Sequence, residues 1–383
     1  MTLSRDLEIV SADVWMVSIP YRRAYGISQG TAQFGKHVVL KLTTKGGIVG
    51  LGEAALVIPE RGNTQESIFS ELQHYLVPAV LGMNALERES LWWRMDHISL
   101  GRHAFPFGKA AVDQALWDIA GRSAGLPVFR LLGGPVRDSI GVSRSLPTVP
   151  PAEMAEAATR LAADGYKMLT VKAGTEPEKD LAAVREVRAA IGPSFPLEVD
   201  PNQGYRADTA ISVLGKMEHY DLQSVEQPCP WWDLDGMASV TAKLSVPIIA
   251  DESVMNEVDT LEVARRRAAH IVCIRLTCAG GITIAAKIVA VAGAAGLGVS
   301  MASRHTFGVG TSAIHHFVAA CPAVQEPIGY GSPLERFAAD IIQQEIPFAN
   351  GVAHPIDAPG FGVDLDLAAM ERYKVGHVHL ARD

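Results

Sequence analysis

The feature that most constrains the fold is a regular alternation of short apolar runs and helical stretches. From about residue 135 onward, each apolar run is followed by a loop and then by a stretch with helical periodicity. Such runs are typical of strands buried on both faces of a parallel sheet, joined by crossover helices. Some 220 residues of this pattern predict a (β/α) barrel, whose site lies at the carboxyl ends of its strands.

The first part of the chain follows a different pattern. Residues 6–56 alternate apolar and polar positions, as strands do, and residues 65–125 have a helical period. Strands followed by helices predict an α+β domain. We therefore divide the chain into an α+β domain (1–130), a barrel (131–355) and a strand-like C-terminal segment (356–383) that returns to the first domain.

Composition excludes several kinds of partner. The net charge of −8 gives no basic face for nucleic acid. The most apolar stretch, residues 288–302, is too short to span a membrane, and the N-terminus carries charges where a signal peptide needs an apolar run. Only four cysteines are present, without metal-site spacing. A cytoplasmic protein is the prediction that fits these features.

Three carboxylates close successive predicted strands. They are Asp200 in LEVDPNQGY, Glu226 in SVEQP and Asp251 in IIADES, spaced 26 and 25 residues apart. Acids at such positions meet at one rim of a barrel, where oxygen ligands favour Mg²⁺ over zinc. Asn202 has the same orientation as Asp200 in extended chain and is expected to support it. The alternative is that these acids only cap the following helices.

Longer motifs resemble the enolase superfamily, and within it the mandelate racemase and muconate lactonizing enzyme group. The matching segments are GKAAVDQALWDIAGRSAGLPVFRLLGG, VKAG, EVDPNQGY, SVEQP, ADES, CAGGIT and PGFGVDLD. The resemblance implies an N-terminal α+β capping domain on a modified (β/α)₇β TIM-like barrel. It also implies a homo-oligomer that holds Mg²⁺ on Asp200, Glu226 and Asp251. The implied chemistry is removal of the proton α to a carboxylate, giving an enediolate.

The resemblance also indicates a base, and places where this chain departs from the family. Lys172 lies at the end of the predicted strand before Asp200 and corresponds to the second lysine of the Lys-x-Lys of the muconate lactonizing branch, whose first position is Thr170 here. The lysine that this branch carries before Gly-Gly on the sixth strand is replaced by Cys278. Arg275 stands where the mandelate racemase branch has an aspartate. Cys278 and His305 are therefore candidate second bases, and Thr170 is a candidate catalytic residue beside Lys172.

Two capping-domain segments, Tyr21–Thr31 and Glu53–Asn63, correspond to the loops that close over the barrel in this family. The residues that we expect to bind substrate are Tyr21, Arg22, Tyr25, Ile58, Arg275 and Glu326. For Arg275 and Arg304, two roles remain open: binding of a second anionic group or bracing of the rim carboxylates.

One clear base favours a reaction that needs only one face of the α-carbon. We therefore expect a lyase, such as a dehydratase of a hydroxylated carboxylic acid, or a cycloisomerase, acting on a small-molecule carboxylate. A racemase or epimerase that uses Cys278 or His305 as second base is the alternative. A metal-binding scaffold without turnover and a hydrolase using metal-bound water are alternatives of other classes.

Overall fold

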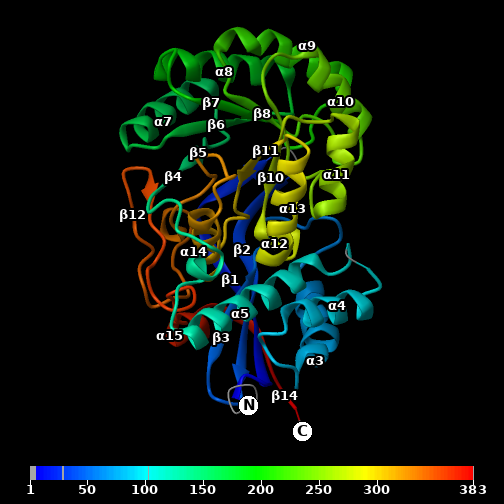
Figure 1. Ribbon diagram of the computed structural model, residues 1–383. Coiled ribbons are helices and arrows are strands. Elements are labelled where there is room, and N and C mark those ends of the chain that lie inside the picture. Colours follow the sequence, from blue (N-terminus) through cyan, green and yellow to red (C-terminus); the bar gives the residue numbers. More distant parts are fainter. Residues whose placement is uncertain (1–5, 28–29, 102, 383) are drawn as a thin grey trace.

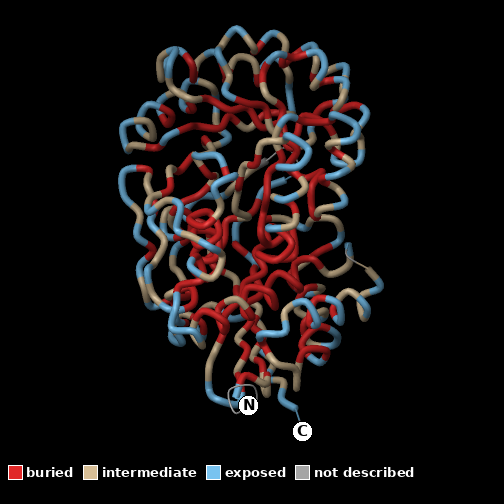
Figure 2. The backbone as a smooth tube through the Cα atoms, viewed as in Figure 1, coloured by how far each residue is buried: buried red, intermediate tan, exposed pale blue. Residues whose placement is uncertain are grey.

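The computed structural model describes residues 6–27, 30–101 and 103–382. Figure 1 shows a curled parallel sheet surrounded by helices, with an antiparallel sheet and further helices beside it. The buried backbone concentrates in the strands and in the helices between the two sheets (Figure 2). The two sheets thus form separate layers that share one core.

The antiparallel sheet has four strands in the order β14-β1-β2-β3. Its strands are β1 (Ile9–Ile27), β2 (Gly30–Thr44), β3 (Val49–Ala54) and β14 (Lys374–Ala381). The expectation of a loop at Tyr21–Thr31 was wrong for most of this segment, because β1 and β2 continue through it as a long hairpin arm. Residues 28 and 29 lie outside the described part.

Helices cover this sheet on the side of the barrel. They are α2 (Gln65–Glu71), the π-helix η1 (Leu72–Leu76), α3 (Val77–Val80), α4 (Arg88–Ile98), α5 (Pro106–Ala124) and α6 (Val128–Leu131). Helix α5 is buried almost all round, as expected of a helix between two layers.

The parallel sheet has seven strands in sequential order. They are β5 (Ser143–Ser145), β6 (Met168–Lys172), β7 (Leu197–Asp200), β8 (Ser224–Glu226), β9 (Ile248–Ala250), β10 (Ile271–Ile274) and β11 (Gly298–Met301). Residues 324–329 close the barrel, since Val324 bridges Val299 of β11 and Ile328 bridges Val142 before β5, both in parallel. The closed ring confirms the predicted TIM-like barrel.

The barrel helices alternate with the strands. They are α7 (Pro151–Ala163), α8 (Pro177–Ile191), α9 (Ala207–Met217), η2 (Glu218–Tyr220), α10 (Leu234–Lys243), α11 (Glu257–Arg266), α12 (Leu276–Ala279), α13 (Ile282–Ala294) and α14 (Gly308–Ala320). In α9 the buried residues Ala210, Val213, Leu214 and Met217 follow the helical repeat. Among the residues that the structure describes, no helix is long and apolar enough to span a bilayer.

Short elements complete the chain. They are β4 (Ile140–Gly141), η3 (Pro333–Glu335), β12 (Phe348–Ala349), β13 (Val352–Ala353) and α15 (Leu367–Tyr373). The strand-like reading of the whole C-terminal segment was wrong for α15, which begins where the Asp366 side chain accepts hydrogen bonds from two backbone N–H groups. The domain limits at residues 130 and 355 stay a prediction.

A buried carboxylate joins the antiparallel sheet to the barrel. Glu53, at the end of β3, accepts hydrogen bonds from the backbone N–H groups of Phe307 (2.7 Å) and Gly310 (2.8 Å) at the start of α14. It also contacts His37 Nδ1 at 2.8 Å. Because a helix N-terminus stabilises a negative charge, this contact fixes β3 and the segment after it against the barrel mouth.

Candidate active site

A cavity of about 500 Å³ opens between the carboxyl ends of the barrel strands and the hairpin arm of β1 and β2. Its wall contains Lys172, Asp200, Glu226, Asp251 and Arg275, which come from five successive strands or their ends. The parallel register places Lys172 directly opposite Asp200. The barrel therefore brings together the acids and the lysine that the sequence indicated.

The three acids differ in their partners. Asp200 Oδ1 accepts a hydrogen bond from the Asn202 backbone N–H (2.7 Å), and its other oxygen contacts Lys172. Asp251 Oδ1 lies 2.6 Å from Arg275 Nε. Glu226 makes no hydrogen bond or ion pair with any described residue, so one of the three carboxylates is left without a cation.

Mutual repulsion is visible in the proton affinities of these groups. Burial, followed by the charges of Asp200 and Asp251, raises the pKa of Glu226 well above its ordinary value. Burial also raises the pKa of Asp251, although Arg275 opposes that shift. Buried carboxylates that repel one another fit a hard divalent cation, which would bind Asp200, Glu226 and Asp251.

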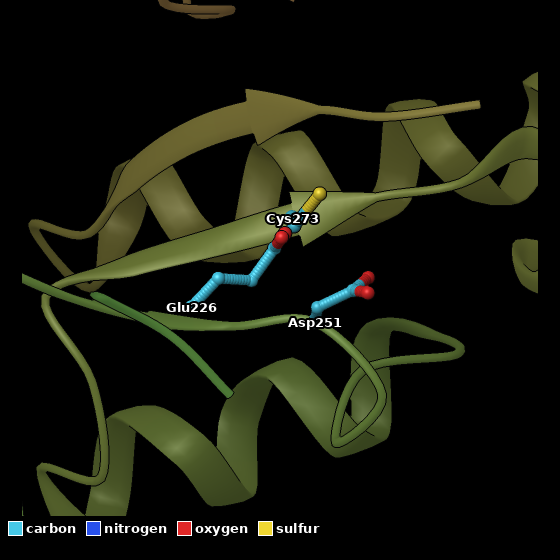
Figure 3. Close-up of side chains that lie close together, drawn as sticks. All are labelled: Glu226, Asp251 and Cys273. Carbon is cyan, nitrogen blue, oxygen red and sulfur yellow. The ribbon is translucent and has the colours of Figure 1, made fainter. Parts of the chain in front are cut away.

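A thiol lies beside two of these acids (Figure 3). Ligand atoms of Glu226, Asp251 and Cys273 all lie within 4.8 Å of one another. Cys273 was not singled out from the sequence, although it lies two residues before Arg275, a spacing that places both side chains on the same side in extended chain. Burial raises the pKa of this thiol well above its ordinary value, which keeps it protonated.

Asn202 lies where we expected it and contacts a further acid. Its side-chain Nδ2 donates to Glu252 Oε1 at 3.3 Å, while its backbone N–H bonds to Asp200. Burial and the charges of Asp251 and Asp200 raise the pKa of Glu252 to about 8. Glu252 was not singled out from its local pattern, because its neighbour Asp251 already filled the strand-end position.

Two buried acids, Glu198 and Glu252, make the stability of the metal-free protein depend on pH. Burial raises the pKa of Glu198 to about 7 and that of Glu252 to about 8 in the folded chain, against 4.5 for an ordinary glutamate. The folded state therefore binds more protons than the unfolded state, and the stabilising contribution is lost as the pH rises through these values. Histidines that stay neutral in the folded protein oppose this trend only below about pH 6.5, where histidines of the unfolded chain are protonated.

We therefore expect the metal-free protein to lose roughly 2 kcal/mol of unfolding free energy between about pH 6.5 and pH 8. Urea unfolding in the presence of a chelator measures this change. The Glu252→Gln variant should show a flatter profile, and Mg²⁺ should also flatten the profile of the unaltered protein. Stability that is constant or rises over this interval would contradict the expectation.

Lys172 ends β6 and lies in the cavity wall. Its Nζ contacts Asp200, and its side chain is 11% exposed. Burial by itself lowers the pKa of Lys172, but the charges of Asp200, Tyr25 and Glu226 raise it well above the ordinary value. A dication that engages Asp200 and Glu226 would weaken this stabilisation of the ammonium.

Thr170 lies two residues deeper on the same strand. Its hydroxyl donates to Glu198 Oε1 at 3.0 Å, and Ser224 donates to the other oxygen of that carboxylate at 2.7 Å. Thr170 lines the cavity but is buried. It therefore holds a buried carboxylate below the acid cluster, a contact that does not favour our prediction of a catalytic role.

Arg275 and Arg304 are both paired with acids. Glu60, from the segment after β3, lies 3.1 Å from Arg275 Nη1 and 2.7 Å from Arg304 Nη2. Burial alone would raise the pKa of Glu60, but Arg304 and Arg275 lower it to about 2. Of the two roles left open by the sequence, bracing of carboxylates is the one that these contacts favour.

The candidate second bases lie in unfavourable positions. Strand β10 ends at Ile274, and Cys278 belongs to the short helix α12, so its thiol is not part of the cavity wall. Burial raises the pKa of that thiol to about 12. His305 does line the cavity, with Nδ1 3.0 Å from the Tyr21 hydroxyl. Burial and nearby arginines lower its pKa well below the ordinary value, which keeps the ring neutral.

Only some of the predicted substrate-binding residues line the cavity. Tyr25 does, whereas Tyr21 lies behind it with its hydroxyl on His305. Arg22 is exposed and donates to the Leu334 carbonyl at 2.8 Å, and Ile58 packs against the core while its neighbour Val57 lines the cavity.

Glu326 lies at the opposite end of the barrel interior. Its carboxylate accepts from the Gly141 backbone N–H at 2.7 Å and lies 3.2 Å from Arg137. Gly141 precedes the first barrel strand, so Glu326 is at the amino end of the strands and away from Lys172. The expectation that Glu326 binds substrate beside the acids is not supported by this position.

Comparison with known proteins agrees with this geometry. The family model "Mandelate racemase / muconate lactonizing enzyme, N-terminal domain" matches residues 9–133, and "Enolase C-terminal domain-like" matches residues 153–369. Muconate cycloisomerase 1 of Rhodococcus opacus is 30% identical over 374 residues, which cover 96% of this chain and 99% of the relative.

Two further proteins are similar over nearly their whole length. L-Ala-D/L-Glu epimerase of Bacillus subtilis is 31% identical over 360 residues, covering 93% of this chain and 97% of the relative. The crystal structure of N-succinyl Arg/Lys racemase from Bacillus cereus has a TM-score of 0.93 at 28% identity, covering 97% and 100% of the two chains. The chain therefore belongs to the mandelate racemase and muconate lactonizing enzyme group of the enolase superfamily and is an enzyme.

Proposed function

We propose that this protein is a Mg²⁺-dependent enzyme that removes the proton α to a carboxylate of a small molecule with Lys172 as base. The observation that carries the proposal is the contact between Lys172 and Asp200 inside a cluster of buried, mutually repelling carboxylates. The relatives are named as cycloisomerases, epimerases and racemases, which does not favour a scaffold without turnover.

The chemistry follows from the charges in the cavity. A proton α to a carboxylate is only weakly acidic, because the resulting enediolate carries a second negative charge. A dication held by Asp200, Glu226 and Asp251 would offset that developing charge. Lys172 accepts the proton at Nζ, and Asp200 stabilises the ammonium that results.

We infer a reaction on one face of the α-carbon, namely an elimination or a cycloisomerisation. Two groups at the end of β10 face the cavity. They are Cys273, whose thiol is kept protonated by burial, and Arg275 just after the strand, whose guanidinium is paired with Asp251 and Glu60. Guanidinium groups do not give up a proton in proteins, so Arg275 is no base. Cys278 is buried outside the cavity wall.

Racemisation or epimerisation is the second candidate. His305 lines the cavity and is neutral, so one of its two ring nitrogens carries a lone pair that can accept a proton. Its low pKa makes it a weak base, which is why we place this candidate second.

Exchange of substrate hydrogen in deuterated water tests the proposal. The enzyme with Mg²⁺ is incubated with acid sugars, hydroxy amino acids and lactones, and deuterium at the α-carbon is followed by NMR. We expect exchange with at least one acid, its loss on chelation, and either an elimination or cyclised product or unchanged configuration. Exchange accompanied by formation of the opposite enantiomer would favour the second candidate. Absence of Mg²⁺-dependent exchange across the collection would overturn both.

A further inference from the structure

One arginine in the cavity wall differs from the others in having no acid. Arg336 lies after η3 and is only 9% exposed, yet it lines the cavity. Its buried Nε has no hydrogen-bond partner, and its terminal nitrogens donate to no described residue. A buried guanidinium normally pairs with a carboxylate, because burial of an unpaired charge is costly.

The acid next to Arg336 in the sequence is paired with other residues. Glu335, its neighbour in sequence, lies 3.4 Å from Arg144 Nη1 and also accepts from the Tyr166 hydroxyl. Burial and the nearby charge of Arg144 lower the pKa of Arg336, as expected for a cation that no described anion compensates.

The guanidinium is held in place by aromatic rings. Its Cζ lies 5.6 Å from the ring centroid of Tyr25 and 5.1 Å from that of Tyr330. The backbone carbonyl of Arg336 accepts from the Arg22 N–H at 2.7 Å, which joins this segment to the β1 arm. Tyr25 also faces Lys172, since its charge contributes to the raised pKa of that lysine. Arg336, Tyr25 and Lys172 all line the cavity.

We propose that Arg336 binds a second carboxylate of the substrate, so that the substrate is a dicarboxylate spanning the cavity from the acid cluster to this arginine. This proposal rests on the proposed function for the first carboxylate, which faces Asp200, Glu226 and Asp251. A carboxylate accepts two parallel hydrogen bonds from a guanidinium, and such charge-assisted pairs are strong when water is excluded. The unpaired cation is thereby compensated only when substrate is present.

Binding of simple acids to the Mg²⁺-loaded protein tests the proposal by calorimetry. The probes are the dicarboxylates malonate, succinate, glutarate and adipate, each paired with its half-amide of equal length. We expect the dicarboxylate of fitting length to bind about 10- to 100-fold more tightly than its half-amide. Arg336→Met should reduce this ratio to about 3-fold or less, and Arg336→Lys should keep part of it.

A matched control separates this effect from the general field of the protein. Arg23 is an exposed arginine on the same β1 arm, and Arg23→Gln removes one positive charge without touching the cavity. In Arg23→Gln we expect the same ratio of dicarboxylate affinity to half-amide affinity as in the unaltered protein. Thermal unfolding of Arg336→Met and Arg336→Lys shows whether each variant is folded.

Two results would overturn the proposal. The first is that none of the tested dicarboxylates binds more tightly than its half-amide. The other is a ratio that persists in both folded Arg336 variants. The measurement needs no turnover, so it is separable from the proposed function: a protein without hydrogen exchange can still discriminate through Arg336, and an active enzyme can fail to do so.

Discussion

Replacing Lys172 by alanine is expected to lower the rate of Mg²⁺-dependent α-hydrogen exchange by about 10²- to 10⁴-fold, which is the usual contribution of a positioned base. Lys172 is the only lysine in the cavity wall that the structure describes, and it contacts Asp200 directly. Deuterium incorporation under single-substrate conditions gives the rate. Lys172→Arg should be similarly inactive, because a guanidinium stays protonated.

Lys172→Ala should bind Mg²⁺ at least as tightly as the unaltered protein, because the ammonium group that competes with Mg²⁺ for Asp200 has been removed. This result would separate loss of the base from loss of the metal site. Lys167→Ala is the matched control, because Lys167 is an exposed lysine just before the same strand. It should keep the full exchange rate. Exchange that survives in folded Lys172→Ala would remove Lys172 from the mechanism.

Replacing Glu226 by glutamine is expected to change stability in opposite directions with and without metal. Glu226 has no cation partner among the described residues, and burial and the charges of Asp200 and Asp251 raise its pKa. Replacing this buried, titratable carboxyl group by a neutral amide should raise the melting temperature of the metal-free protein. The variant should also lose the increase in unfolding free energy that Mg²⁺ binding gives. That increase is about 2.7 kcal/mol for a ligand at 100 times its Kd.

Thermal unfolding with a chelator and with increasing Mg²⁺ measures both effects. Glu326→Gln serves as the control, because Glu326 is also a glutamate of the barrel interior but pairs with Arg137 at the amino end of the strands. Its Mg²⁺-dependent gain should equal that of the unaltered protein. A Glu226→Gln protein that keeps the full gain would show that the cation is bound without Glu226.

Local sequence pattern was sufficient for the barrel and for the residues at its strand ends. Buried strands of three to five residues, such as β7 and β9, leave their last side chain at the rim, so Asp200 and Asp251 could be placed from spacing alone. The same reasoning gave Lys172. The resemblance to the family placed Cys278 on the sixth strand, but the chain turns into α12 soon after β10, so Cys278 lies in a helix.

Contacts between distant segments could not be read from the sequence. Glu60 is 215 residues from Arg275, and nothing in either local pattern indicates that they pair. Arg336 lies outside every regular strand, so its place in the cavity wall follows only from the closure of the barrel by residues 324–329. The extended β1 arm was missed because Tyr21–Thr31 was assigned as a loop from the resemblance to the family.

The pairing of β14 with β1 joins a late segment of the chain to an early one in a single sheet. Residues 374–381 form the outer neighbour of the strand that carries Tyr21 and Tyr25. A growing chain can assemble the barrel and its acid cluster first, while β1 still lacks one side of its hydrogen bonding. The four-stranded sheet that contains the β1 arm is therefore complete only after all the barrel strands have been synthesised, because β14 follows them in the chain.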